Sequence, residues 1–198
     1  RQLRIAHAVF PARFAWLPGG QGGSERPPRG RDCRYRIFFV NRAIRVPEVR
    51  VVNEDAFVWL VQPPADLFDV AIVDFPDPHN FSLGKLYTRH FYARLKSRLD
   101  PAGVVAVQST SPLMARRSFW CINGTMEAAG FSVRPYHALV PSFGEWGYAL
   151  ATLSPAPVPS RVIDGLSYLD DATLASLFVL GPDMARVELR TGDDLRLA

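Results

Sequence analysis

The chain has 198 residues, of which 48% are hydrophobic and 21% are charged, and its formal net charge is +4. These values indicate one globular domain that is long enough to bury a core, and they exclude an intrinsically disordered chain. No stretch approaches ~18 uncharged apolar residues, so we expect no membrane-spanning helix within the sequence.

The cysteines and the charge distribution indicate the cellular environment and the class of partner. Cys33 and Cys121 form neither a disulfide framework nor a metal-ligand spacing, and the first residues lack a signal-peptide pattern, which favours a reducing, cytoplasmic environment. Residues 1–50 hold eleven arginines against three acidic residues, a net charge of +8, so the remaining 148 residues carry −4. The arginines are scattered and no recognition motif accompanies them, so we expect no nucleic-acid partner.

The first 48 residues are predicted to be an irregular segment. Residues 16–36 mix Gly, Pro and Arg in a composition that buries little surface, and only residues 36–40 are typical of a strand. No apolar strand of adequate length leads into the Gly-rich stretch LPGGQGGSERPP (17–28), and two prolines end it where a helix should begin.

From Val49 onward the chain alternates strand and helix patterns. The predicted strands cover 49–53, 68–75, 104–110, 131–140 and 145–153, and the predicted helices cover 55–62, 82–99 and 116–130. This β-α-β-α-β-α-β-β order predicts a mainly parallel sheet with helices on both faces and a C-terminal antiparallel hairpin. A proline-rich connector (154–163) and one more helix within 167–180 follow.

Several aromatic residues on the predicted helices are expected in the core. Tyr87 and Phe91 share an i+4 stripe with Leu83 and Leu95 in the helix predicted over 82–99. Trp120 lies on a similar stripe of the next helix. Gly130 is predicted to end that helix as its C-terminal cap.

Polar residues gather where the predicted strands end. Asp55, Asp74 and Gln108 lie at or just past carboxyl ends of strands, where ligands bind in sheets of this kind. Asp77 follows Asp74 by three residues across a proline-containing turn. Two carboxylates at one rim suit a diamine, because one accepts a proton from the reacting amine while the other holds the second ammonium. Turn chemistry that starts a helix at residue 83 explains the same acids, and the residues alone leave both interpretations open.

Three stretches together carry a resemblance to a known family. FDVAIVDFPDPHNF (68–81), VVAVQSTSP (104–112) and VPSFGEWG (140–147) resemble the spermidine synthase family, the polyamine aminopropyltransferases. The chain is most similar to the bacterial branch in which this domain follows a membrane-embedded segment. The resemblance covers about 49–153, with a weaker match at 169–187.

This resemblance implies a Rossmann-like α/β fold of the class I methyltransferase type. Its first half is expected to be incomplete, because the N-terminal donor-binding half of the family is not matched. The expected organisation is an irregular segment (1–48), an aminopropyltransferase-like catalytic domain (49–153), and a connector with a C-terminal helix (154–198).

The resemblance also implies an activity and an acceptor site. The family transfers an aminopropyl group from decarboxylated S-adenosylmethionine to putrescine or a related amine, and it releases methylthioadenosine and a proton. Asp74 matches the proton-accepting carboxylate, Asp77 the acid that anchors the diamine, and Gln108 a polar residue that faces the cleft. Phe143 stands where many members carry a substrate-contacting tyrosine. Glu145 is expected either to extend this acidic rim or to be an exposed hairpin charge.

On the donor side, Asp55 and Ala56 fall where the family contacts the adenine, and Phe81 lies in the loop that borders the donor. Decarboxylated S-adenosylmethionine is then a co-substrate, and no cofactor is expected. The histidines at 79, 90 and 137 show no ligand spacing, so we expect no metal.

The sequence leaves several alternatives open. The chain is expected to be an aminopropyltransferase, whole or impaired, a non-catalytic polyamine-binding member of the family, or a methyltransferase that uses S-adenosylmethionine. An irregular segment (1–48) followed by regular strand and helix patterns also fits a fragment or a shifted reading frame of a longer gene. A homodimer and a membrane-embedded segment in a longer parent chain are further expectations.

Overall fold

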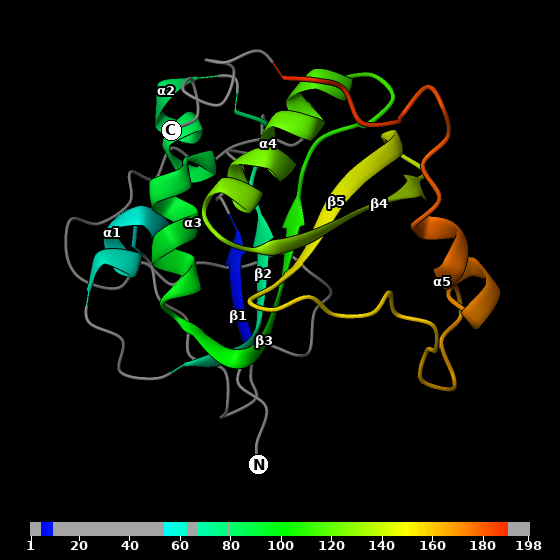
Figure 1. Ribbon diagram of the computed structural model, residues 1–198, viewed down its shortest axis with the longest axis horizontal. Helices are drawn as coiled ribbons and strands as arrows, with labels where there is room; N and C mark the ends of the chain where they lie inside the picture. Colours follow the sequence, from blue (N-terminus) through cyan, green and yellow to red (C-terminus); the bar gives the residue numbers. More distant parts are fainter. Residues whose placement is uncertain (1–4, 10–53, 63–66, 79, 190–198) are drawn as a thin grey trace, which may run out of the picture. The chain divides into compact units, whose positions relative to one another are not determined.

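The structure is a computed structural model that describes residues 5–9, 54–62, 67–78 and 80–189 (Figure 1). In chain order its elements are β1 Ile5–Val9, α1 Ala56–Val61, β2 Phe68–Asp74, α2 Phe81–Gly84, the 3₁₀ helix η2 Lys85–Tyr87, α3 Arg89–Lys96, β3 Leu99–Gln108, α4 Arg116–Ala128, β4 Ser132–Val140, β5 Gly144–Thr152 and α5 Asp171–Leu177. Arg1–Phe10 and Ala56–Ala198 form one compact unit, and Pro11–Asp55 a second. Of the second unit only Glu54 and Asp55 are described, so the fold belongs to the first.

Five strands form one sheet in the order β1-β2-β3-β5-β4. Strands β1, β2 and β3 run parallel, whereas β5 pairs antiparallel with both β3 and β4. The predicted hairpin is confirmed: β4 and β5 are joined by residues 141–143, and Gly144 follows at a φ of +77° that glycine adopts without strain. The predicted α/β class with a C-terminal hairpin is therefore confirmed.

Strand β1 corrects the sequence analysis, which expected no strand before residue 36. It pairs in parallel with β2 from Ile5 opposite Val70 to Val9 opposite Asp74. Pairing satisfies backbone groups along the edge of β2, and this gain does not depend on a long apolar run. The strands predicted at 36–40 and 49–53 lie outside the described residues, as does the expected gap in the first half of the fold.

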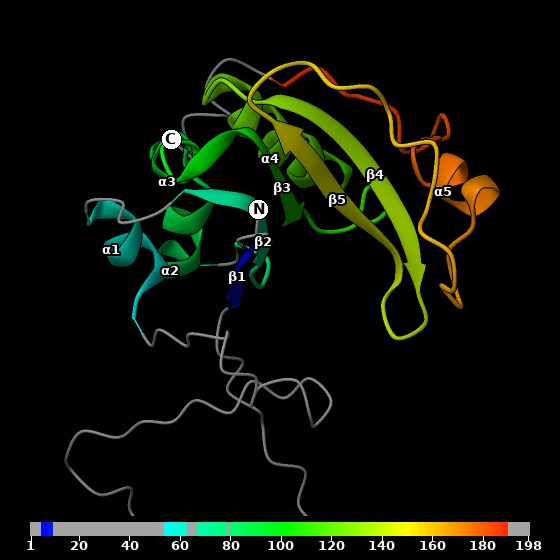
Figure 2. The same cartoon turned by 90° about the horizontal axis from the view of Figure 1, so that it is seen from below.

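The core lies on one face of the sheet, under α3 and α4 (Figure 1, Figure 2). Alternate strand residues on this face are at most 3% exposed, namely Ala71, Val73, Val105, Val107, Ala149 and Ala151. On the opposite face, Ile72 is 38% exposed. Helices were predicted on this face as well, and among the described residues α5 reaches it, because the ring of Phe178, the C-cap of α5, lies 5.5 Å from the ring of Tyr136 on β4.

The single helix predicted over 82–99 is divided into α2, η2 and α3. Thr88 leaves the helical conformation, and its hydroxyl accepts a hydrogen bond from the Phe91 backbone N–H at 3.2 Å, so it is the N-cap of α3. The predicted stripe nevertheless lines the core, because its members are each at most 5% exposed: Leu83, Tyr87, Phe91 and Leu95. Periodicity identified the buried side chains but missed a threonine whose hydroxyl competes for backbone bonds.

Strand β3 begins five residues earlier than predicted and ends two residues earlier. Residues 100–103, which include Pro101 and Gly103, lie within a register shift against β2 between Phe68 and Val70, which accommodates a proline within a strand. The strand ends at Gln108 because Thr110 has a φ of +61°, outside the β region. This early end places Ser109 and Thr110 in the loop above the sheet.

The helix predicted over 116–130 is confirmed as α4, and Gly130 caps it. Gly130 has a φ of +88°, and the Phe131 N–H donates to the Met126 carbonyl at 3.2 Å, the bond that closes such a cap. Trp120 is 5% exposed, as expected of a core residue.

The segment after α5 runs along α4 and is held by side chains of that helix. Trp120 Nε1 donates to the Met184 carbonyl at 3.0 Å, Arg116 Nε donates to the Ala185 carbonyl at 2.7 Å, and Arg186 pairs with Glu127. The connector at 154–163 forms neither helix nor strand. None of the helices in the described ranges has the length and hydropathy that a membrane span needs.

Candidate active site

The candidate site is built around residues 74–77, which we name the acid loop. Asp74 is the last residue of β2 and Gln108 the last of β3. Because the two strands pair in register up to Val73 and Val107, Asp74 and Gln108 end side by side at the carboxyl edge of the parallel strands. Both residues are half-buried. The structure thus brings these two predicted site residues together at the edge where such sheets bind ligands.

A buried tyrosine holds the acid loop from the core side. Tyr87 is 1% exposed, and its hydroxyl donates to the carbonyl oxygens of Phe75 and Pro76, both at 3.0 Å. Burial raises the pKa of Tyr87 well above its ordinary value, and the charges of Asp77 and Asp74 raise it further. The phenol therefore stays protonated and remains a donor. Helical periodicity placed Tyr87 in the core but carries no information about its hydroxyl.

Asp77 receives a hydrogen bond from the loop that follows β3. Thr110 Oγ1 donates to Asp77 Oδ2 at 2.9 Å. Asp77 is not the cap of the next helix, because Asn80 Oδ1 accepts from the Leu83 N–H at 3.0 Å at the start of α2. The turn therefore starts the next helix through Asn80, as the turn interpretation expected, while Asp77 accepts from Thr110, so both interpretations of Asp77 stay open. Thr110 was missed by the sequence analysis, although its place two residues after the strand-ending Gln108 was a usable signal.

Two stacked tyrosines extend the site along the sheet. Gln108 pairs with Tyr148, which pairs with Tyr136. Directly paired residues share a face, so these side chains lie with Asp74 on the face opposite α3 and α4. The two tyrosine rings are stacked with centroids 5.1 Å apart. The sequence analysis missed this row, although strand alternation at Trp146, Tyr148 and Leu150 predicts a shared face.

Burial keeps both phenols neutral. Burial raises the pKa of Tyr148, and the charge of Asp74 raises it further. Burial, and then Tyr148, raise the pKa of Tyr136 to about 12. The row consequently presents a carboxylate, an amide and two neutral phenols.

The tip of the β4–β5 hairpin, which we define as residues 141–145, carries two further residues implied by the resemblance. Phe143 is 69% exposed in the turn, and its ring centroid lies 5.4 Å from that of Trp146. Glu145 Oε2 lies 3.2 Å from His137 Nδ1, and His137 Nε2 lies 2.8 Å from the Val179 carbonyl. By strand alternation Glu145 faces the side of the sheet opposite Asp74 and Gln108. The structure does not bring Glu145 to the acid loop.

The three donor-side residues are described only in part. Asp55 is exposed and directly precedes α1, in the second compact unit, and Ala56 is the half-buried first residue of α1. Phe81 begins α2, but its side chain lies outside the described residues. Their roles toward a donor stay predictions.

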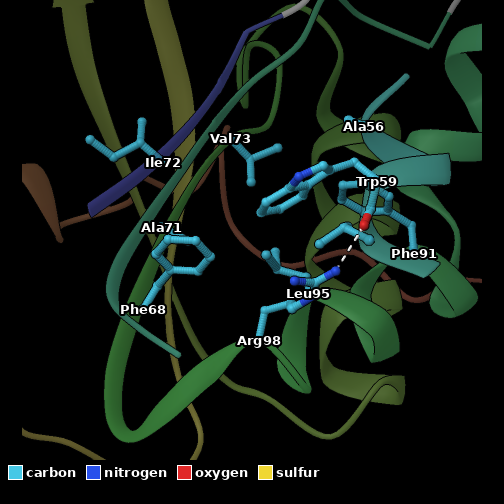
Figure 3. A pocket seen from close by; sticks show the side chains of 10 residues that line it. Ala56, Trp59, Phe68, Ala71, Ile72, Val73, Phe91, Leu95 and Arg98 are labelled. Atoms are coloured by element: carbon cyan, nitrogen blue, oxygen red, sulfur yellow. Dashed lines mark hydrogen bonds between the residues drawn. The ribbon is translucent and has the colours of Figure 1, made fainter. Parts of the chain in front are cut away.

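A small cavity lies beneath the middle of β2 rather than at the acid loop (Figure 3). Its walls are apolar side chains from α1, β2 and α3, and Arg98 closes one end by donating to the Trp59 carbonyl at 2.8 Å and the Gln62 carbonyl at 2.6 Å. Its volume is about 40 Å³, far below the roughly 300–1,000 Å³ of ligand pockets. Neither Asp74 nor Asp77 lines it, so we interpret it as a packing defect of the core.

Comparison with known proteins identifies the family. Residues 34–161 match the model of the spermine/spermidine synthase domain. The chain belongs to the spermine/spermidine synthase family. It is 50% identical over 147 residues to polyamine aminopropyltransferase 2 of Ralstonia nicotianae, 72% of this chain and 28% of that protein. It is 46% identical over 145 residues to polyamine aminopropyltransferase of Leptospira interrogans, 73% of this chain and 29% of that protein.

Solved structures support the fold. A spermidine synthase crystallised in complex with the transition state analogue AdoDATO has a TM-score of 0.61 at 22% identity, over 70% of this chain and 50% of that one. Spermidine synthase from Thermotoga maritima has a TM-score of 0.53 at 18% identity, over 66% of this chain and 46% of that one. The Rossmann-like class predicted from sequence is thereby confirmed. The chain spans less than a third of the curated relatives' length.

Proposed function

We propose that this spermine/spermidine synthase domain transfers an aminopropyl group from decarboxylated S-adenosylmethionine to putrescine or a related amine. The observation that carries the proposal is the convergence of Asp74, Gln108 and the Thr110-bonded Asp77 on one strand edge. Family membership supports aminopropyl transfer, since relatives at 46–50% identity are named polyamine aminopropyltransferases. Neither observation favours methyl transfer.

The acids supply what the acceptor amine needs. An alkyl ammonium has a pKa near ~10.4, so at neutral pH the acceptor is protonated and cannot attack. In the proposal, Asp74 takes the proton of the reacting nitrogen, while Asp77 forms an ion pair with the distant ammonium. Gln108 is proposed to contact the chain between them, and the substrate contact of Phe143 stays a prediction of the resemblance.

The transfer step is balanced without a metal. The amine lone pair attacks the methylene carbon beside the sulfonium, the carbon–sulfur bond breaks, and its electron pair leaves on sulfur as neutral methylthioadenosine. Because Asp74 has already taken one proton from the acceptor ammonium, the alkylated nitrogen leaves as the secondary ammonium of the product, and Asp74 passes its proton to water. Because both substrates are cations and little charge develops, the protein mainly aligns them and removes a proton. Asp55, Ala56 and Phe81 are proposed to border the donor. The structural neighbour crystallised with the transition state analogue AdoDATO supports a ligand of this class, without reference to these residues.

The setting proposed from sequence accompanies this activity. We place the catalytic domain at 49–153, with flanking segments at 1–48 and 154–198, in the cytoplasm. Small molecules are the proposed partners, whereas the homodimer and the membrane-embedded parent segment stay predictions of the resemblance.

Mass spectrometry tests the activity directly. The purified chain is incubated with putrescine and decarboxylated S-adenosylmethionine, and spermidine and methylthioadenosine are quantified. The proposal expects equimolar formation of both products. Methyl transfer from S-adenosylmethionine without an aminopropylated product would favour a methyltransferase, and putrescine binding with neither activity would favour a non-catalytic polyamine-binding member.

A further inference from the structure

We propose that Thr110 is a positioning residue that fixes Asp77 in the orientation needed to hold the acceptor amine. The inference rests on the proposed function and adds a residue to it. Thr110 need not touch the substrate in this account; it acts through the carboxylate to which its hydroxyl donates.

The contact joins two loops at the carboxyl edge of the sheet. Thr110 lies two residues beyond the end of β3 and is 4% exposed. Its hydroxyl donates to Asp77 Oδ2 at 2.9 Å, across 33 residues of sequence. A hydrogen bond to a carboxylate is stronger than one between neutral groups, and a buried donor loses little of it to water. The bond therefore restricts the rotation of the Asp77 side chain.

The Thr110 backbone is strained. Among the described non-glycine residues it is the one with positive φ, at +61°. A β-branched residue rarely adopts this conformation, whereas glycine and asparagine do so at lower cost. Such strain persists only where the surroundings impose it, and it is concentrated at functional sites.

Gly147 on β5 imposes this conformation. The Ser109 N–H donates to the Gly147 carbonyl at 2.9 Å, and the Gly147 N–H donates to the Thr110 carbonyl at 2.7 Å. A Cβ on Gly147 would lie 2.6 Å from the Thr110 carbonyl oxygen and 2.5 Å from the Phe119 ring, so only glycine allows this approach. The two bonds hold the Ser109 N–H and the Thr110 carbonyl, and so the backbone of both residues, against β5.

Tyr87 holds the acid loop from the core side, because its hydroxyl donates to the carbonyl oxygens of Phe75 and Pro76. The acid loop is thus tied at its backbone by one hydroxyl and at its terminal carboxylate by another. This two-sided attachment is what a preorganised ion-pair site requires, because an ammonium gains most from a carboxylate that needs no rearrangement.

Four variants separate positioning from a merely structural role. Thr110→Val removes the hydroxyl at nearly constant shape, Thr110→Gly removes it while relieving the strain, and Thr110→Ser retains it. The control is Thr125→Val, since Thr125 is 2% exposed and its hydroxyl donates to the Cys121 carbonyl within α4, away from the acid loop.

The readout is the KM for putrescine against kcat, with melting temperatures. We expect Thr110→Val and Thr110→Gly to raise this KM about tenfold, the loss expected when one hydrogen bond to a charged group is removed. The KM for the donor should stay unchanged, Thr110→Ser should restore wild-type KM, and Thr125→Val should lower only the melting temperature. An unchanged KM in the folded Thr110→Gly variant would overturn the inference.

A second measurement separates this inference from the proposed function. Melting temperatures of Thr110→Val, Asp77→Asn and the double variant form a cycle that does not depend on activity. A double variant less destabilised than the sum of the single ones supports the coupling, and additive shifts overturn it. If the unaltered chain neither forms spermidine nor binds putrescine in calorimetry, the proposed function fails, whichever result the cycle gives.

Discussion

The acid loop and the hairpin tip both carry residues that the resemblance implies in substrate binding, yet the two regions differ in their surroundings. Around the acid loop, Tyr87 and Thr110 donate hydrogen bonds from two separate segments of the chain. At the hairpin tip, Phe143 is 69% exposed and Glu145 lies beside His137 on the other side of the sheet. The comparison teaches that strand direction and side-chain alternation decide which motif positions converge.

The two regions also differ in the elements that hold them in place. The acid loop begins at the end of β2, and pairing with β1 on one side and β3 on the other fixes the position and direction of that strand. The tip projects past the last residue of β3, and its polar contacts connect it to the segment after α5. We therefore expect substitutions at the acid loop and its anchors to change chemistry, and substitutions at the tip to change local stability.

The largest effect is predicted for Asp74→Asn, which keeps the shape but cannot accept the proton. Turnover should fall by about 10²–10⁴-fold, the usual contribution of a general base. Product formation followed by mass spectrometry measures the loss. Asp164→Asn, an exposed change directly after the connector, is the control and should leave turnover unchanged. Retained turnover in Asp74→Asn would remove Asp74 from the role of base.

Gly147→Ala tests the backbone clamp on the Thr110 loop. Because its Cβ would overlap the Thr110 carbonyl and the Phe119 ring, we expect a loss of about 1–3 kcal/mol in the free energy of unfolding, typical of overpacking. Urea unfolding measures it. The control is Gly84→Ala, since Gly84 has helical backbone angles and nothing within 4 Å of an added Cβ. Equal stability of the two variants would refute the clamp.

Tyr87→Phe tests the attachment of the acid loop to the core. Two buried carbonyls lose their phenol donor, so we expect a loss of about 1–3 kcal/mol of stability, accompanied by lower turnover. Thermal unfolding and product assays measure both. Tyr92→Phe is a matched control, because the fully buried Tyr92 hydroxyl has no hydrogen-bond partner among the described residues, and its removal should be neutral or stabilising. Wild-type turnover in Tyr87→Phe would show that the loop does not need this anchor.

The smallest effect is predicted for Glu145→Gln. Its carboxylate is a quarter exposed and pairs with His137, so the variant should lose less than about 1 kcal/mol of stability. The KM for putrescine should not change, since Glu145 faces away from the acid loop. A clear rise in that KM, measured beside the Asp74 variant, would show that Glu145 contacts the substrate. The hairpin tip would then belong to the same site as the acid loop.

Sequence patterns predicted the layers of the fold better than its local conformations. Unbroken apolar runs identified β2 and the later part of β3, and i+4 spacing identified buried residues such as Phe91 and Leu95. The break at Thr88 was not predictable from periodicity, because side-chain capping decides it. Strand β1 was missed because the edge of β2, rather than its own composition, stabilises it.

The site residues also differ in how far sequence patterns could predict them. Asp74 and Gln108 could be predicted at one edge, because parallel strands end together. Sequence position marked Thr110 and Tyr148 as candidates, but their contacts depend on a positive φ and on antiparallel register, which a single sequence does not encode locally. The face occupied by Glu145 followed from the same register.

A crystal structure with putrescine and methylthioadenosine bound would locate the acceptor relative to the two acids. We expect one amine nitrogen within about 3 Å of an Asp74 oxygen and the other within the same distance of Asp77. Putrescine bound at the hairpin tip, or bound with both nitrogens away from the acid loop, would contradict it.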